Sequence, residues 1–91
     1  MKTISILGST GSIGCNALDV IRLHSDKFDI FALSGHENVD LLFTQAVEFN
    51  PSYIVTKDEK SQVRLTKLLK EKKLNIEVLF GPDGYRFIAG H

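Results

Sequence analysis

The sequence has little cysteine, little proline and no net charge. It contains one cysteine, Cys15, and two prolines among 91 residues, and its 11 basic residues balance its 11 acidic ones. A single cysteine excludes an internal disulfide framework and a multi-cysteine zinc site, and it fits a reducing compartment. Because neither sign of charge is in excess, nothing in the composition points to nucleic acid or an anionic membrane as a partner.

Long hydrophobic runs are also absent. No apolar stretch approaches the roughly 18 residues that a membrane-spanning helix needs, and the apolar segment before Gly8 is too short for a secretory signal peptide. We therefore expect a cytoplasmic protein without a membrane partner. With 91 residues, 43% of them hydrophobic, the chain has room for one domain with one modest core.

What the sequence does contain is an alternation of apolar strands and amphipathic helices. Strands are predicted at residues 3–7, 28–34, 52–56 and 76–80. Helices are predicted from residue 12 to the polar break at 24–27, after the N-cap Asn38 to residue 49, and from residue 58 or 61 to about residue 73. Apolar spacing assigns ten residues to the buried helix faces: Ile13, Ala17, Val20, Ile21, Leu42, Ala46, Phe49, Leu65, Leu68 and Leu69.

This order of elements predicts an α/β fold. Strands that alternate with helices over short connections form a parallel sheet with helices on both faces, the doubly wound class, and its crossovers are right-handed. About four strands of such a sheet are present. Residues 81–84 are predicted to form a turn, and residues 85–91 look like the start of another helix. We therefore expect an incomplete sheet that continues in a longer protein.

The strongest functional signal lies between the first strand and the first helix. Gly8, Gly11 and Gly14 recur at intervals of three within the segment SILGSTGSIGCN. Gly8 permits the tight turn out of the strand, Gly11 lets the backbone approach a pyrophosphate, and Gly14 lets the helix pack against the strand. The amides of residues 10–13 would then meet the anion at the positive end of the helix.

A glycine at the end of a strand often does no more than make a turn. Three glycines in register between a strand and an amphipathic helix favour a nucleotide site instead. The hydroxyls of Ser9, Thr10 and Ser12 would add hydrogen-bond donors at its rim. The spacing Gly-x-x-Gly-x-x-Gly is one residue longer than the common dinucleotide fingerprint, and a longer loop is typical of NADP-binding variants of the fold.

The end of the second strand is expected to select the cofactor. NAD sites place a carboxylate there, whereas NADP sites leave room and a cation for the 2′-phosphate. The strand ends at Ser34, so no carboxylate lies at its tip. The residues that could hydrogen-bond a 2′-phosphate are Ser34, Gly35, His36 and Asn38. The carboxylate of Glu37 would repel a phosphate and is expected to face solvent.

Taken together, these segments resemble a known family. The stretches ILGSTGSIG, LDVI, ALSGHENV and FNPSYIV are similar to the start of the 1-deoxy-D-xylulose 5-phosphate reductoisomerases, and the similarity extends over essentially the whole chain. The resemblance implies a homodimeric, NADPH-dependent enzyme that also uses a divalent metal, Mg²⁺ or Mn²⁺. Such an enzyme converts the sugar phosphate 1-deoxy-D-xylulose 5-phosphate into 2-C-methyl-D-erythritol 4-phosphate in non-mevalonate isoprenoid biosynthesis.

The resemblance also implies which residues contact the cofactor. With the turn glycine included, the predicted cofactor-binding residues are Gly8, Thr10, Gly11, Ser12, Ile13, Gly35, His36 and Asn38. Glu37 stands where the family commonly has Lys or Arg, which weakens the expected preference for NADPH over NADH. A protonated His36 could replace part of the missing charge.

The resemblance further implies that the catalytic groups, the metal ligands and the substrate-phosphate ligands lie beyond residue 91. Residues 1–91 are therefore expected to be a truncated, N-terminal NADPH-binding Rossmann-like domain. They would contain no catalytic or metal-binding residue and would be inactive alone.

Two other functions remain open on the residues alone. A non-catalytic dinucleotide-sensing module of the same fold would carry the same motif, because fold does not determine function. Another NADP-dependent Gly-x-x-Gly-x-x-Gly reductase, such as a semialdehyde dehydrogenase, would need a nucleophilic cysteine further along the chain. Cys15 is instead predicted to be a small packing residue.

Overall fold

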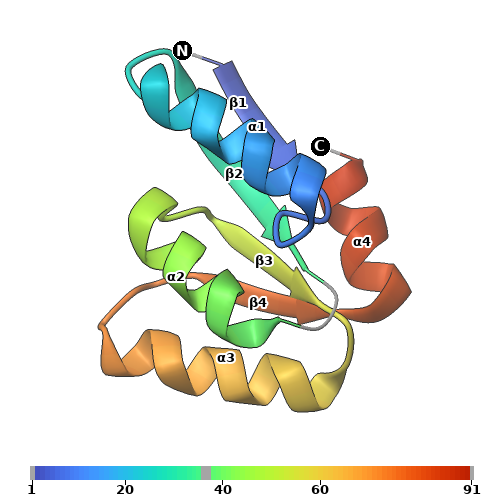
Figure 1. The fold of residues 1–91 in the computed structure, drawn as a ribbon. Coiled ribbons are helices and arrows are strands. Elements are labelled where there is room, and N and C mark those ends of the chain that lie inside the picture. The colour runs from blue at the N-terminus through green and yellow to red at the C-terminus, as the bar shows by residue number, and fades with distance from the viewer. Residues whose placement is uncertain (1, 36–37, 91) are drawn as a thin grey trace.

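The structure, a computed structural model, describes residues 2–35 and 38–90. In these residues four strands alternate with four helices (Figure 1). The strands are β1 (Lys2–Ile6), β2 (Phe28–Ser34), β3 (Tyr53–Thr56) and β4 (Glu77–Phe80), and the helices are α1 (Ser12–Leu23), α2 (Val39–Phe49), α3 (Glu59–Glu71) and α4 (Gly81–Ala89). The predicted strands and the first three predicted helices are confirmed to within about two residues at their ends.

The strands form one parallel sheet in the order β1-β2-β3-β4. The strands follow one another across the sheet in a single direction. Right-handed crossovers therefore place α1, α2 and α3 on the same face of the sheet. α4 lies on the opposite face (Figure 1). The predicted α/β sheet with helices on both faces is therefore confirmed, although the helices are unevenly divided between them.

The two faces of the sheet have separate cores. The larger core lies under α1, α2 and α3 and includes Leu33 and Ile54 from the strands. The smaller core consists of Ala32, Val55 and Ile88 under α4. Neighbours along a strand point to opposite faces, so β2 and β3 are buried on both sides. This explains why their sequences are apolar without a strict alternation.

The face that α1 turns to the sheet differs from the prediction. Its buried residues are Gly14, Leu18 and Ile21, whereas Ile13 and Val20 are 86% and 55% exposed. A Cβ at position 14 would lie 2.2 Å from the carbonyl oxygen of Gly8, so only glycine can occupy the point of closest approach. That contact sets the rotation of the helix, and the apolar stripe that includes Ile13 and Val20 lies on its flank.

α2 and α3 begin at side-chain caps, as predicted. The Asn38 Oδ1 atom accepts a hydrogen bond from the backbone N–H three residues on, at 3.0 Å, and Asp58 Oδ1 does the same at 2.9 Å. The cap of α3 is thus Asp58, whose pKa is lowered by the backbone N–H that it accepts. Of the predicted core residues on these helices, Leu42, Ala46, Leu65 and Leu69 are buried, and Phe49 and Leu68 are partly buried.

Residues 81–84 are helical, so the prediction of a turn was wrong. α4 begins at Gly81, with Pro82 in its first turn. A proline is tolerated there because the backbone N–H groups of a first turn have no intrahelical hydrogen-bond partner. A Cβ at Gly84 would lie 3.0 Å from side-chain atoms of Leu79 and Val55. Of the two glycines that suggested a turn, Gly84 is therefore explained by the close packing of α4 on the sheet, whereas Gly81 has a φ of +72° at the point where the chain leaves β4.

Candidate functional site

The glycine-rich segment connects β1 to α1 at the carboxyl end of the sheet. β1 and β2 are parallel neighbours, with Ile6 opposite Leu33, so the connection after β2 leaves the sheet at the same end. Ligands of open α/β sheets bind outside the carboxyl ends of the strands. The structure therefore brings together the two connections that contain the predicted cofactor-binding residues.

Two of the three glycines are required by the fold itself. Gly8 has a φ of +70°, a conformation that residues with a Cβ rarely adopt. Gly14 is the contact point between α1 and the turn, where a Cβ would overlap the backbone of Gly8 and Ser9. Gly8 and Gly14 thus have the roles that the sequence predicts for them.

At position 11, by contrast, the fold itself does not require a glycine. The φ of −82° at Gly11 is open to any residue, and a Cβ there would meet only the Gly8 carbonyl oxygen, at 3.4 Å. This is the near limit of ordinary van der Waals contact. Because neither backbone conformation nor packing demands glycine at this exposed position, Gly11 is suited to a point where a ligand approaches the backbone.

The N-terminus of α1, next to Gly11, is open to an anion. No side chain caps the helix, and no acidic residue lies in its first turn. The N–H groups of a first turn lack intrahelical partners, and the helix dipole makes this end positive. Ser12 and Ile13 are exposed and Thr10 is half-buried. α4 also lacks a capping side chain, but Asp83 lies in its first turn.

Two hydroxyls that were predicted to face the ligand point inward instead. Ser9 and Ser34 are fully buried. Ser9 Oγ donates to Gln45 Oε1 at 2.7 Å, and Ser34 Oγ accepts from the Gly8 backbone N–H at 2.9 Å. Both predictions were wrong, because the direction of these hydroxyls depends on α2 and on the neighbouring connection. Sequence reasoning missed Gln45, although a polar residue on the apolar face of a helix is a signal that could have identified it.

The connection after β2 is only partly described. Gly35 is buried, its N–H donates to the Val55 carbonyl oxygen at 3.2 Å, and a Cβ there would lie 2.9 Å from Leu42 Cγ. Asn38 is exposed, but its side-chain oxygen caps α2, which leaves its NH₂ group to donate to a ligand. His36 and Glu37 lie outside the described residues.

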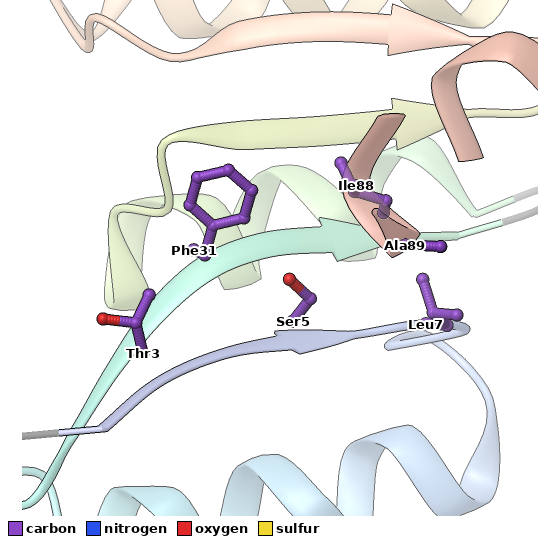
Figure 2. Close-up of a pocket in the computed structure, with 6 residues that line it drawn as sticks. All are labelled: Thr3, Ser5, Leu7, Phe31, Ile88 and Ala89. Atoms are coloured by element: carbon purple, nitrogen blue, oxygen red, sulfur yellow. The ribbon is translucent and has the colours of Figure 1, made fainter. Parts of the chain in front are cut away.

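A hollow of about 400 Å³ lies on the other face of the sheet, between β1, β2 and α4. Figure 2 shows Thr3 and Ser5 of β1, and Leu7 directly after it, pointing into this hollow, away from α1, with Ile88 of α4 opposite them. Only Leu7 adjoins the glycine-rich turn. The candidate site is therefore an open surface at the strand ends, and this hollow is a separate feature beside β1.

Residues 2–35 and 38–90 contain no group of three or more His, Cys, Asp or Glu side chains arranged to hold a metal ion. No helix in this part of the chain is long and apolar enough to cross a membrane.

Comparison with known proteins identifies the family. The sequence model of the family described as 1-deoxy-D-xylulose 5-phosphate reductoisomerase matches residues 4–91. The chain belongs to this family. It is 43% identical over 91 residues to the reductoisomerase of Tolumonas auensis and 56% identical over 90 residues to that of Lawsonia intracellularis. These two matches include 100% and 97% of this chain. They include only 23% and 22% of the length of the two relatives.

Solved reductoisomerase structures share the fold of the chain. One, a complex with NADPH, fosmidomycin and magnesium, is 36% identical with a TM-score of 0.93, over 98% of this chain and 22% of that one. The Zymomonas mobilis reductoisomerase in complex with NADPH is 31% identical with a TM-score of 0.89, over 97% of this chain and 23% of that one. The chain therefore has the Rossmann-like fold of a segment that makes up less than a quarter of these reductoisomerases.

Proposed function

We propose that residues 1–91 are the N-terminal, NADPH-binding part of a Rossmann-like domain in a longer 1-deoxy-D-xylulose 5-phosphate reductoisomerase. The observation that carries the proposal is Gly11, which has no conformational or packing role, at the uncapped N-terminus of α1. The reductoisomerase structures in complex with NADPH support the choice of cofactor.

In this proposal the pyrophosphate is held mainly by backbone groups. The amides in the first turn of α1 donate to its oxygens, and the bare Gly11 lets the phosphate come close. The hydroxyls of Thr10 and Ser12 add donors at the rim. The connection after β2 contacts the adenosine ribose and its 2′-phosphate. The proposed cofactor-binding residues are Gly8, Thr10, Gly11, Ser12, Ile13, Gly35, His36 and Asn38.

The longer protein would convert 1-deoxy-D-xylulose 5-phosphate into 2-C-methyl-D-erythritol 4-phosphate, for which NADPH supplies the hydride. The magnesium complexes of related reductoisomerases support a divalent metal. Because the described residues hold no cluster of metal-ligand side chains, we place the metal ligands and the catalytic groups in the remainder of the protein. We further propose that this protein is a cytoplasmic homodimer without a membrane or nucleic-acid partner.

Titration of the full-length protein with NADPH and NADH, followed by cofactor fluorescence, tests the proposed function. We expect NADPH to bind more tightly than NADH, because no carboxylate lies at the end of β2. Equal affinities would contradict this selectivity and would implicate Glu37. If neither cofactor binds, the proposed function itself is wrong.

The variant Gly11→Ala tests whether the turn is a binding surface. We expect the dissociation constant for NADPH to rise at least about tenfold, equivalent to about 1.4 kcal/mol, because a methyl group would occupy the space of the phosphate. The free energy of unfolding should change by less than about 1 kcal/mol, because two effects oppose each other. Alanine is a poorer N-cap than glycine, which lowers stability, but it reduces the conformational entropy of the unfolded chain, which raises stability.

Gly90→Ala is the matched control for this variant. Gly90 has a φ of −78°, which any residue can adopt, and its Cβ would lie 3.4 Å from the Arg86 carbonyl oxygen, so alanine meets as little hindrance there as at Gly11. It lies at the end of α4, and NADPH should bind this variant normally. A Gly11→Ala protein that binds NADPH like the control but unfolds at a lower temperature would show that the segment is only a turn.

A further inference from the structure

A buried polar cluster joins α2 to the glycine-rich turn. Gln45 is 5% exposed and Ser9 is fully buried. Gln45 Nε2 donates to the Ser9 carbonyl oxygen at 2.8 Å, and Ser9 Oγ donates to Gln45 Oε1 at 2.7 Å. One carboxamide therefore holds both the backbone and the side chain of Ser9.

The same turn is held from its other side by Ser34, the last residue of β2. The Ser34 carbonyl oxygen accepts from the Ser9 backbone N–H at 2.6 Å, and Ser34 Oγ accepts from the Gly8 N–H at 2.9 Å. We call Ser9, Ser34 and Gln45 the Ser9 cluster. Its bonds connect the turn after β1 to the point where the chain leaves β2, and to the helix that follows.

Filling the core does not account for Gln45. It lies on the buried face of α2 with Leu42 and Ala46, where an apolar side chain would pack without a polar group to satisfy. Burying a carboxamide is unfavourable unless its donors and its acceptor are hydrogen-bonded. Among the described residues, the hydrogen bonds of this carboxamide all go to Ser9, apart from a 3.9 Å contact with Cys15 Sγ. The chemistry of Gln45 is thus matched to the turn.

We propose that Gln45 is a positioning residue for the dinucleotide. By holding Ser9 it orients the peptide that leads into Thr10 and Gly11, and so aims the amides at the N-terminus of α1 toward the pyrophosphate. Because Ser34 directly precedes the connection to α2, the cluster also sets the spacing between the pyrophosphate and the adenosine ribose. This inference rests on the proposed function of the site.

The test is Gln45→Met in the full-length protein, a change that keeps an unbranched side chain of similar length. Loss of a buried hydrogen-bonding partner typically changes an equilibrium constant by about tenfold or more. We therefore expect the dissociation constant and the KM for NADPH to rise about tenfold. The value of kcat at saturating NADPH should stay within about twofold of the wild type, since Gln45 does not reach the reacting atoms in this proposal.

Gln62→Met is the matched control. Gln62 Nε2 on α3 donates to the Val78 carbonyl oxygen at 2.8 Å, so this variant also removes a partly buried bond between a helix and a backbone carbonyl, on the β4 side of the sheet. It should lower the melting temperature and leave the KM for NADPH unchanged. If both variants raise the KM equally, or if Gln45→Met lowers only the melting temperature, Gln45 is merely structural and the inference is overturned.

Ser9→Ala keeps the inference testable if Gln45→Met does not fold. It removes only the hydroxyl and keeps the hydrogen bonds of the Ser9 backbone, so we expect a rise of a few fold in the dissociation constant. If both single variants fold, the double variant should bind NADPH no more weakly than Gln45→Met, because both changes break one unit. Unchanged NADPH binding by Ser9→Ala and additive effects in the double variant each contradict the inference. Failure of the wild-type protein to bind NADPH contradicts the proposed function instead.

Discussion

At the scale of single residues, the three glycines of the turn have three different physical roles. Gly8 provides a positive φ, Gly14 provides room for another backbone, and Gly11 provides an open surface. Identical residues at equal spacing therefore make different contributions to folding and to binding. Substituting the glycines one at a time separates these roles.

Gly14→Ala should mainly affect stability. Its Cβ would lie 2.2 Å from the Gly8 carbonyl oxygen and 2.6 Å from Ser9 Cα, and these are backbone atoms that cannot move without displacing the turn. Overpacking of this kind typically costs about 1–3 kcal/mol, which urea unfolding would measure. An unchanged free energy of unfolding would mean that α1 moves away from the turn without penalty, and the contact would then not be what sets the rotation of α1.

At the scale of elements, an ion pair joins the outer surfaces of α1 and α2. The Arg22 guanidinium binds the Glu48 carboxylate through Nε and through Nη2, the latter at 2.7 Å, and it also reaches Asp19 at 2.6 Å. It lies 5.3 Å from the centre of the Phe49 ring. The hydrogen bond to Arg22 lowers the pKa of Glu48 below its ordinary 4.5.

This lowered pKa predicts a pH dependence of stability. A carboxylate whose pKa is lower in the folded state stabilises the protein at pH values above its unfolded pKa, and the effect is lost as the pH falls through the folded pKa. The melting temperature of Glu48→Gln should therefore be slightly lower than that of the wild type at pH 7, and this difference in melting temperature should vanish in acid. The side chains of Arg22 and Glu48 are 47% and 41% exposed, so the difference in melting temperature should be small.

Added salt provides the control for this prediction. Because exposed charges are screened within about 10 Å at 0.1 M salt, the difference in melting temperature at pH 7 should shrink as salt is raised. A difference that persists in acid and in high salt would show that the substitution does not act through the charge of Glu48.

At the scale of the whole molecule, β1 lies at one edge of the sheet. Leu7, directly after β1, is a large apolar side chain that is 56% exposed, and a hollow lies between β1 and α4 (Figure 2). Unpaired strand edges and exposed apolar patches favour association with another chain or segment. The relatives that the chain matches are about four times as long, since it spans 22–23% of them.

We therefore expect residues 1–91, produced alone, to self-associate. Sedimentation velocity should show an average mass that rises with concentration, and Leu7→Lys should reduce this rise because it places a charge beside the β1 edge. In the longer protein the same substitution should instead lower stability, if other parts of the chain cover this surface. A fragment that stays monomeric and unfolds cooperatively would show that the uncovered edge is tolerated.

The sequence by itself determined the order of strands and helices and the α/β class, and it singled out the candidate site at the first strand-to-helix connection. These features depend on local properties: apolar periodicity, the caps Asn38 and Asp58, and glycines directly after a strand. Such information lies within windows of at most roughly 18 residues along the chain, and it is present before any long-range contact forms.

Only the tertiary structure decided which face α1 buries, that residues 81–84 are helical, and that Ser9 points to Gln45 rather than to the ligand. Each depends on atoms brought together by the sheet: Gly14 against Gly8, Gly84 against Leu79 and Val55, and Ser9 against a residue 36 positions away. The direction of a hydroxyl or the rotation of a helix is set by its nearest neighbours in space, and periodicity does not encode those neighbours.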